Sequence, residues 1–368
     1  MRNIAIVGAS YLQLPLIQKA KEMGYKTHVF AWAVGDVGEA EADVFYPISI
    51  VNKEEVLKKC LEIGICGICS IASDLASITV NYVANHMGLT ANSMEATMKS
   101  TNKYLMRKTF EINGDPSPRS IVIDRNTNYY SLDIDFPAIV KPTDRSGSRG
   151  IYKVSSFDEV ENAVKASMDE SFEKKALIEE FVEGQEYSVE YISHGGRHYF
   201  LAMTLKYTTG APHFIETAHL QPASVDSDTV DKVKEIVEHA LDSLGITDGA
   251  SHSELKISSE GVIKIIEIGG RMGGDCIGSD LVHYSTGIDF VKAVIQVACG
   301  EAPDLKPDRE KQPAKVVFIF TEDDLKEFQR IRIEEPDKLL KIVDDRHFSL
   351  VGRTTDSSNR AGCYIIKG

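Results

Sequence analysis

Residues 251–268 read Ser251-His252-Ser253-Glu254-Leu255-Lys256-Ile257, then the turn Ser258-Ser259-Glu260-Gly261, then Val262-Ile263-Lys264-Ile265-Ile266-Glu267-Ile268. The apolar and β-branched flanks and the glycine in the turn are typical of a β-hairpin. If Glu260-Gly261 forms a two-residue loop, Ser259 faces Val262. Glu254 then lies directly opposite Glu267 on the same face of the sheet.

Two carboxylates in this arrangement repel each other and weaken a sheet. A divalent cation between them removes the repulsion, and Mg²⁺ commonly binds one or two carboxylates together with substrate phosphates. The alternative is a pair of unrelated carboxylates on a solvated face, since a one-residue error in register would separate them. The apolar neighbours on both strands favour the metal site.

Two glycine-rich segments lie on either side of this hairpin in the sequence. Gly269-Gly270-Arg271-Met272-Gly273-Gly274-Asp275 follows it and could bring Arg271 to a phosphoryl group. Upstream, residues 141–150 join two predicted strands, and their glycines and serines allow the main chain to fold over a polyphosphate. This loop has no G-K-[ST] and precedes a strand, so it is not a Walker A loop. A solvated hairpin loop is the alternative.

The rest of the chain predicts an α/β protein. In residues 1–95, strands alternate with helices, which predicts a parallel sheet with helices on its faces. A β-rich piece follows, and two long hairpins come after residue 186. The predicted helices span 14–23, 53–63, 78–87, 100–112, 157–168, 230–244 and 289–299; the predicted strands span 4–7, 27–32, 64–71, 120–123, 138–141, 151–154, 176–182, 187–193, 199–205, 252–257 and 262–268.

Composition excludes several classes of function. The chain has 368 residues, 43% of them hydrophobic, and a formal charge of −14, which suits two or three folded domains and gives no broad basic face for nucleic acid. No apolar run approaches the ~20 residues of a membrane span. The N-terminus has the pattern of a first strand rather than of a signal peptide, so we expect a cytoplasmic protein.

Two further motifs carry little functional weight. Cys66 and Cys69 form a C-x-x-C, but a zinc site needs a second pair and the sequence has none, so a buried strand is expected. Gly8-Ala9-Ser10 follows the first strand without the G-x-G-x-x-G pattern. A nicotinamide oxidoreductase is therefore an alternative function, but the sequence lacks the dinucleotide-binding pattern that it would need.

In their order and spacing, these segments resemble the ATP-grasp superfamily of carboxylate–amine ligases, most closely the L-amino-acid-ligase and carbamoyl-phosphate-synthetase-like branch. The resemblance implies an α/β fold with α+β parts. We expect a Rossmann-like domain at 1–98, a linking helix and small β-rich lid domain at 99–184, and a larger antiparallel-sheet domain with a C-terminal extension at 185–368. ATP would be held between the last two.

The resemblance also implies roles for individual residues. Lys103 and Lys141 would contact the nucleotide phosphates, and Arg271 and Lys141 would be catalytic. Glu254 and Glu267 would bind Mg²⁺, with Mn²⁺ as an alternative. The remaining nucleotide contacts would be the lid-loop residues Ser146, Gly147, Ser148 and Gly150, the adenine contacts Glu179 and Val182, and the ribose contact Glu186.

On the substrate side, the resemblance implies Glu216, His219, Arg271, Gly273 and Gly274. Glu216 would bind an ammonium group, and His219 would orient substrate or carry a proton; a hydrogen-bonded loop histidine is the alternative. One departure stands out, because Gly269 occupies the position where the family's E-x-N-x-R pattern has a metal-binding asparagine. This leaves the number of metal ions open.

The implied reaction converts a carboxylate into an acyl phosphate with ATP and couples it to an amine, releasing ADP and phosphate. The expected partners are small-molecule carboxylate and amine substrates, with a homodimer implied by the family and no nucleic acid or membrane. Alternatives within the fold are bicarbonate-activating enzymes, such as biotin carboxylases or carbamoyl-phosphate synthetases, and purine-pathway ligases. An ATP-binding regulator without turnover is a further alternative.

Overall fold

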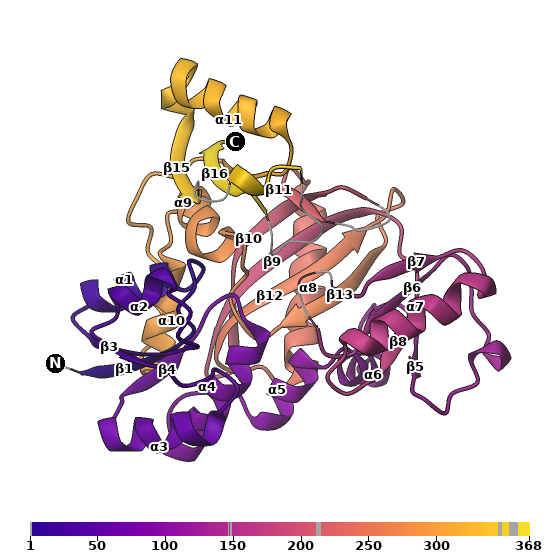
Figure 1. The fold of residues 1–368 in the computed structure, drawn as a ribbon, viewed down its shortest axis with the longest axis horizontal. Helices are drawn as coiled ribbons and strands as arrows, with labels where there is room; N and C mark the ends of the chain where they lie inside the picture. The colour runs from indigo at the N-terminus through magenta and orange to yellow at the C-terminus, as the bar shows by residue number, and fades with distance from the viewer. Residues whose placement is uncertain (1, 146, 148, 211–214, 345–347, 353–359) are drawn as a thin grey trace.

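The computed structural model describes residues 2–145, 147, 149–210, 215–344, 348–352 and 360–368, and these residues form three sheets (Figure 1). Each sheet takes its strands from one of the three stretches expected from the sequence. The predicted α/β fold with an antiparallel C-terminal sheet is thereby confirmed. In the described part of the chain, no helix combines the length and apolar character needed to cross a membrane.

The first sheet is parallel, as predicted, with the order β3-β2-β1-β4. Its apolar core is shared with α10, a helix from late in the sequence that packs on α1 and β4 (Figure 1). Cys69 is buried in β4, and Cys66 is half-buried just before it, as expected for a structural strand. The elements are β1 (Asn3–Val7), α1 (Leu14–Glu22), β2 (Lys26–Phe30), α2 (Val37–Glu41), β3 (Val44–Tyr46), α3 (Lys53–Ile63), β4 (Gly67–Cys69) and α4 (Asp74–Met87).

The second sheet is small and antiparallel, in the order β5-β8-β6-β7, with α7 packed against it. Since β6 and β7 pair directly, residues 143–151 are the connection of a β-hairpin. The elements are β5 (Ser120–Ile123), η1 (Tyr129–Ser131), β6 (Ala138–Pro142), β7 (Tyr152–Val154), α7 (Phe157–Glu170) and β8 (Ala176–Glu180).

The link between these sheets differs from the single helix predicted over 100–112. The chain forms α5 (Met94–Thr101) and α6 (Lys103–Asn113), separated by Asn102 in an extended conformation. The Asn102 side chain accepts hydrogen bonds from the backbone N–H groups of Tyr104 and Leu105, as an N-cap does. The break makes Lys103 the first residue of α6, which directs it to the large sheet.

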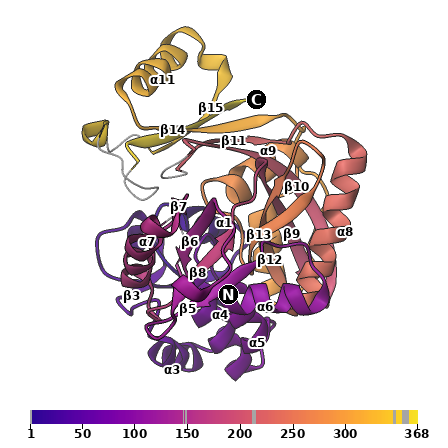
Figure 2. The same cartoon turned by 90° about the vertical axis from the view of Figure 1, so that its right-hand side faces the viewer.

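The third sheet is the largest, in the order β13-β12-β9-β10-β11-β14-β16-β15. Figure 2 shows α8 along this sheet and the C-terminal strands at its far end. The elements are β9 (Gln185–His194), β10 (Arg197–Thr208), β11 (Glu216–Gln221), α8 (Ser227–Leu244), β12 (Gly249–Ile257), β13 (Ile263–Gly269), η2 (Ile277–Leu281), α9 (Val282–Thr286), α10 (Phe290–Ala298), β14 (Ala314–Ile319), α11 (Glu322–Glu334), η3 (Pro336–Lys338), β15 (Leu339–Asp344), η4 (Phe348–Leu350) and β16 (Gly362–Lys367).

The β12–β13 hairpin places Glu254 opposite Glu267, as predicted, but by a different route. The two-residue loop was wrong: Ile257 pairs with Ile263, and the loop closes with the Ser258 N–H donating to the Val262 carbonyl at 2.9 Å. This wider loop shifts the register by one residue. A β-bulge at Ile266 then restores the register, since Leu255 pairs with Ile265 and Glu254 with Glu267.

Helix α6 provides a matched test of the core, because Phe110 is fully buried whereas Ile112 is 80% exposed. We expect Phe110→Ala to lower the free energy of unfolding by about 3–5 kcal/mol, through lost burial and the cavity that remains. Ile112→Ala on the same helix should change it by less than about 0.5 kcal/mol. Urea denaturation measures both losses. Equal losses would contradict the burial of Phe110 in the apolar core that α6 shares with α8 and the large sheet.

Candidate active site

The three parts of the chain meet around a cavity of about 500 Å³. The first domain contributes residues 10–12 and Asp74, the β6–β7 connection contributes Gly147 and Arg149, and the large sheet contributes strands β10 to β12. A cavity of this size suits a small-molecule ligand. A second cavity of about 210 Å³ is lined by Lys103, Arg145 and Glu267. Asp74 lines both cavities.

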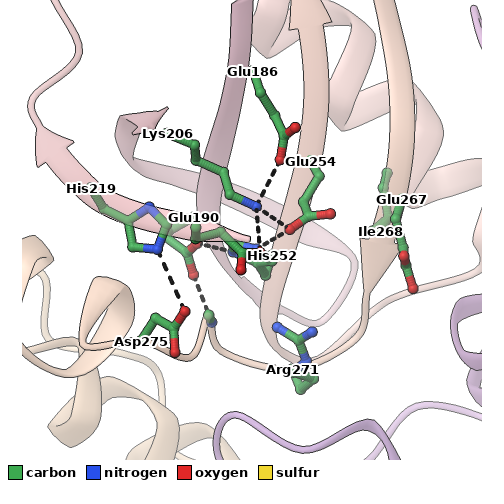
Figure 3. Close-up of polar contacts among 12 residues, drawn as sticks. Glu186, Glu190, Lys206, His219, His252, Glu254, Glu267, Ile268, Arg271 and Asp275 are labelled. Atoms are coloured by element: carbon green, nitrogen blue, oxygen red, sulfur yellow. Dashed lines mark hydrogen bonds and ion pairs between the residues drawn. The ribbon is translucent and has the colours of Figure 1, made fainter. Parts of the chain in front are cut away.

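Lys206 of β10 lies at the centre of a cluster of carboxylates (Figure 3). Its Nζ is 2.5 Å from Glu254 Oε1 and 3.0 Å from Glu186 Oε1, and Glu216 Oε1 is 3.8 Å away. Burial alone would lower the pKa of Lys206, but attraction to these three carboxylates raises it well above its ordinary value. Burial opposes ionisation of Glu254 as well, and Lys206 nevertheless holds the pKa of Glu254 well below its usual range.

Glu267, the second carboxylate of the hairpin, has a lysine of its own. Lys103 Nζ donates to Glu267 Oε1 and to the Arg145 carbonyl, both at 2.7 Å. The two facing carboxylates are therefore each neutralised by a lysine from a different element. Both are oxygen donors on adjacent strands, which suits a hard cation such as Mg²⁺. Among the described residues no group of three His, Cys, Asp or Glu could hold a metal ion.

Arg271 pairs with Asp74 of α4 and lies within electrostatic range of both hairpin carboxylates, which are labelled with it in Figure 3. Its Nε is 2.9 Å from Asp74 Oδ1, and its side chain is 17% exposed. Burial alone would lower the pKa of Arg271; Asp74, Glu254 and Glu267 together raise it. Burial likewise disfavours the charged form of Asp74, yet Arg271 lowers the pKa of that carboxyl. The pair is charged at neutral pH.

A buried acid–base pair joins β12 to the neighbouring strand β9. Glu190 of β9 is fully buried and accepts hydrogen bonds from His252 Nδ1 and, at 2.9 Å, from the Gly273 N–H. His252 Nε2 is 3.4 Å from Glu254 Oε1. Burial would lower the pKa of His252, but Glu190 outweighs it and raises the pKa to about 9. His252 is therefore an imidazolium at neutral pH.

The two predicted substrate glycines lie in different surroundings. A Cβ on Gly273 would lie 2.7 Å from Glu190 Oε1 and His252 Nδ1, so only glycine fits there. The Gly273 N–H donates to Glu190, whereas Gly274 lines the larger cavity.

In the β6–β7 connection, Gly147 and Gly150 have positive φ angles of 73° and 68°. Ser146 and Ser148 lie outside the described residues.

Lys141 and Glu179 form a buried cluster with Arg107. Lys141 Nζ is 2.6 Å from Glu179 Oε2, and Arg107 Nε is 2.8 Å from Glu179 Oε1. Burial lowers the pKa of Lys141, and Glu179 only partly opposes it. The Glu179 side chain is thus occupied by two cations, which leaves main-chain groups for the predicted adenine contact. The Val182 carbonyl, the other predicted contact, accepts from Lys256 Nζ at 3.2 Å.

The other end of the larger cavity is charged. Arg360 lies 3.2 Å from Glu216 and 2.8 Å from Asp275 Oδ2, and His219 Nε2 is 3.6 Å from the same Asp275 oxygen. His219 is buried in strand β11, so the loop-histidine alternative was wrong. Burial lowers the pKa of His219, which makes its ring neutral at pH 7.

The charged residues of the site that the sequence analysis missed include Lys206, Asp74, Glu190 and Arg107. Each is paired with a residue more than 40 positions away in the sequence. Glu190 and Lys206 could have been found from the sequence, because each is an ionisable residue within a largely apolar predicted strand or directly after one. For Asp74 and Arg107 the sequence gives no such signal.

The raised pKa of His252 has a measurable consequence. A histidine with a folded-state pKa near 9 and an unfolded pKa near 6.5 stabilises the fold below pH 6.5 and loses that contribution as pH rises through about 9. The full contribution is about 3 kcal/mol. We expect the difference in unfolding free energy between wild type and His252→Gln to shrink from pH 7 to pH 10.

His28→Gln is the control for this titration, because burial lowers the pKa of His28 and its contribution stays constant above pH 7. Urea denaturation at several pH values measures both differences. A wild-type–His252→Gln difference that stays constant from pH 7 to pH 10 would contradict a buried imidazolium.

Comparison with known proteins supports the α/β fold with a large antiparallel C-terminal sheet. Residues 134–280 match the family model of the ATP-grasp domain. The alanine–anticapsin ligase of Bacillus subtilis is 24% identical over 72% of this chain, and the chain spans 61% of that protein's length. The L-amino acid ligase from Bacillus licheniformis has a TM-score of 0.81 at 21% identity, covering 100% of this chain and 93% of that one.

A second solved structure, the phosphoribosylglycinamide synthetase from Anaerococcus prevotii, has a TM-score of 0.76 at 22% identity, covering 100% of this chain and 94% of that one. At these identities the two structures show a shared fold. The segment that matches the family model contains Glu254, Glu267 and Arg271. The match therefore identifies residues 134–280 as similar to the ATP-grasp domain, and the chain as a whole shares its fold with these two structures.

Proposed function

We propose that the protein is an ATP-dependent ligase that activates a carboxylate as an acyl phosphate and joins it to an amine. The observation that carries the proposal is the pairing of Glu254 with Glu267 on the bulged hairpin, next to Arg271 and two lysines. The similarity to alanine–anticapsin ligase and the fold shared with an L-amino acid ligase support amino-acid-like substrates.

The proposed chemistry follows from the poor reactivity of a carboxylate towards amines. Transfer of a phosphoryl group converts one carboxylate oxygen into a leaving group. Because charge is spread over the transferring group, positioning and electrostatic stabilisation do most of the catalysis. Lys103, which contacts Glu267, and Arg271, which is within electrostatic range of both glutamates, supply fixed positive charge beside the hairpin carboxylates. Glu254 and Glu267 would hold Mg²⁺, which supplies further positive charge to the phosphate oxygens.

Lys141 remains the second proposed phosphate lysine. Although its Nζ contacts Glu179, Lys103 and Glu267 are close enough to influence its pKa. Burial and the adjacent cations lower the pKa of Lys141, so a phosphate oxygen nearby would stabilise its charged form. The β6–β7 connection would exclude water from the acyl phosphate, because Gly147 and Arg149 line the cavity.

The charged end of the cavity suits a zwitterionic substrate. Glu216 and Asp275 are acceptors for an ammonium group, and Arg360 between them is a donor for a carboxylate. His219 is neutral and adjacent to Asp275, so it can hold or accept a proton there. These groups neutralise one another in the structure, and a zwitterion would replace both kinds of contact.

The test is a phosphate-release screen with ATP and Mg²⁺ over pairs of amino acids and small carboxylates, with product mass spectrometry. Hydroxylamine is added in a parallel series, because it traps an acyl phosphate as a hydroxamate. The proposal expects amine-dependent phosphate release, a product with a new C–N bond, and a hydroxamate when hydroxylamine replaces the amine. Phosphate release stimulated by bicarbonate alone, without amino acid, would instead support a bicarbonate-activating enzyme.

The hairpin carboxylates give the sharpest variants. Glu254→Gln and Glu267→Gln keep the side-chain shape but remove the charge, so we expect kcat to fall by about a hundredfold or more at saturating Mg²⁺. Glu260→Gln is the matched control, because Glu260 is exposed in the turn of the same hairpin. Near-wild-type turnover of Glu267→Gln would refute the assignment of this hairpin.

A further inference from the structure

A carboxylate of the first domain reaches into the site from outside the ATP-grasp domain. Asp74 is the first residue of α4, and Ser73 caps that helix by accepting from the Ala76 N–H at 3.2 Å. Next to it, the Ala72 N–H donates to the Met272 carbonyl at 3.2 Å. The start of α4 is therefore attached by main-chain contact to the segment that carries Arg271.

Asp74 holds the Arg271 guanidinium at two points. Oδ1 is 2.9 Å from Nε, and Oδ2 is 3.4 Å from an Nη atom of the same guanidinium. Two contacts to one carboxylate fix the plane of a guanidinium as well as its position. The two side chains are 16% and 17% exposed, so little water competes for these contacts.

Gly269 has no side chain, and the Asp74–Arg271 pair occupies the space that a side chain there would fill. Its φ angle is outside the left-handed region, so the backbone conformation of β13 would accept any residue. A Cβ at this position, however, would lie 3.1 Å from Asp74 Oδ1 and 3.3 Å from Arg271 Nε. The asparagine expected from the E-x-N-x-R pattern would extend further into the same space. A side chain at position 269 would therefore displace the ion pair, whereas the chain conformation itself does not demand glycine.

We infer that Asp74 is a positioning residue that occupies the space left by the missing side chain at position 269 and fixes Arg271 against the reacting phosphoryl group. The inference rests on the proposed function, since it assigns Arg271 to phosphoryl transfer. The location of Asp74 supports it, because Asp74 lines both the cavity of Lys103 and Glu267 and the cavity of Glu254. The first domain thereby sets the geometry of a group in the ATP-grasp domain.

The kinetic test uses Asp74→Asn, which keeps the shape and removes the charge, and Gly269→Ala, which keeps both charges and displaces the pair. For each, we expect kcat to fall at least about tenfold while the KM for ATP changes less than about twofold, because a misplaced group costs transition-state stabilisation rather than ground-state binding. Either variant with wild-type kcat would overturn the inference.

Asp289→Asn is the matched control. Asp289 also joins the first and large domains, through Lys19 at 3.0 Å, and it is buried away from the cavities. Asparagine can still cap α10, so this variant should lower the melting temperature and leave kcat unchanged. A loss of kcat in Asp289→Asn equal to that in Asp74→Asn would show a general effect of loosening the domain contact, and would overturn a specific role for Asp74.

A ligand-free measurement separates this inference from the proposed function. Gly269→Asn should lower the melting temperature by several degrees in the wild type and by no more than about one degree in the Asp74→Ala background, where the space is free. Equal losses in both backgrounds would overturn the shared-space argument. Calorimetric titration of the wild type with ATP and Mg²⁺ tests the proposed function separately, because it measures nucleotide binding. Absence of binding would contradict the proposed function, whereas the comparison of melting temperatures would still test the shared-space argument.

Discussion

Two carboxylates on adjacent strands impose a constraint on everything around them, since like charges at this separation destabilise a sheet unless cations are close. Glu254 and Glu267 meet this constraint through Lys206 and Lys103, and Arg271 lies close to both. Each cation comes from a different part of the chain, and each part must be positioned accurately for its charge to offset the repulsion between the two carboxylates. The break at Asn102, which starts α6 at Lys103, and the bulge at Ile266 both serve this arrangement.

The charges also connect parts of the chain that are far apart in the sequence. Arg271 joins the ATP-grasp domain to the first domain through Asp74, and Lys103 joins the linking helix to the large sheet. Buried ion pairs of this kind contribute little net stability, because desolvation offsets their attraction. Their value is geometric: they leave few alternative positions for the charged groups. A site built in this way is already preorganised for a highly charged substrate such as a nucleotide.

The sequence predicted what depends on local pattern. The helix at 53–63 was located to the residue, since apolar periodicity and Gly64 mark its course and end. The facing of Glu254 and Glu267 was correct although the turn was wrong, because the bulge compensated for it. The pairs that complete the site could not be predicted: Asp74 and Arg271 are 197 residues apart, and no periodicity relates them. Strand β11 and the C-terminal strands were likewise unassigned, since their pairing is set by the sheet edge they extend.

The central claim is that the β12–β13 hairpin binds the metal that accompanies ATP. A crystal structure with a non-hydrolysable ATP analogue and Mn²⁺, with the metal located by anomalous scattering, tests it most directly. The account predicts Mn²⁺ bound to both Glu254 and Glu267, with the triphosphate extending towards Lys103 and Arg271. Mn²⁺ bound to neither glutamate, or a nucleotide seated against the first sheet, would contradict it.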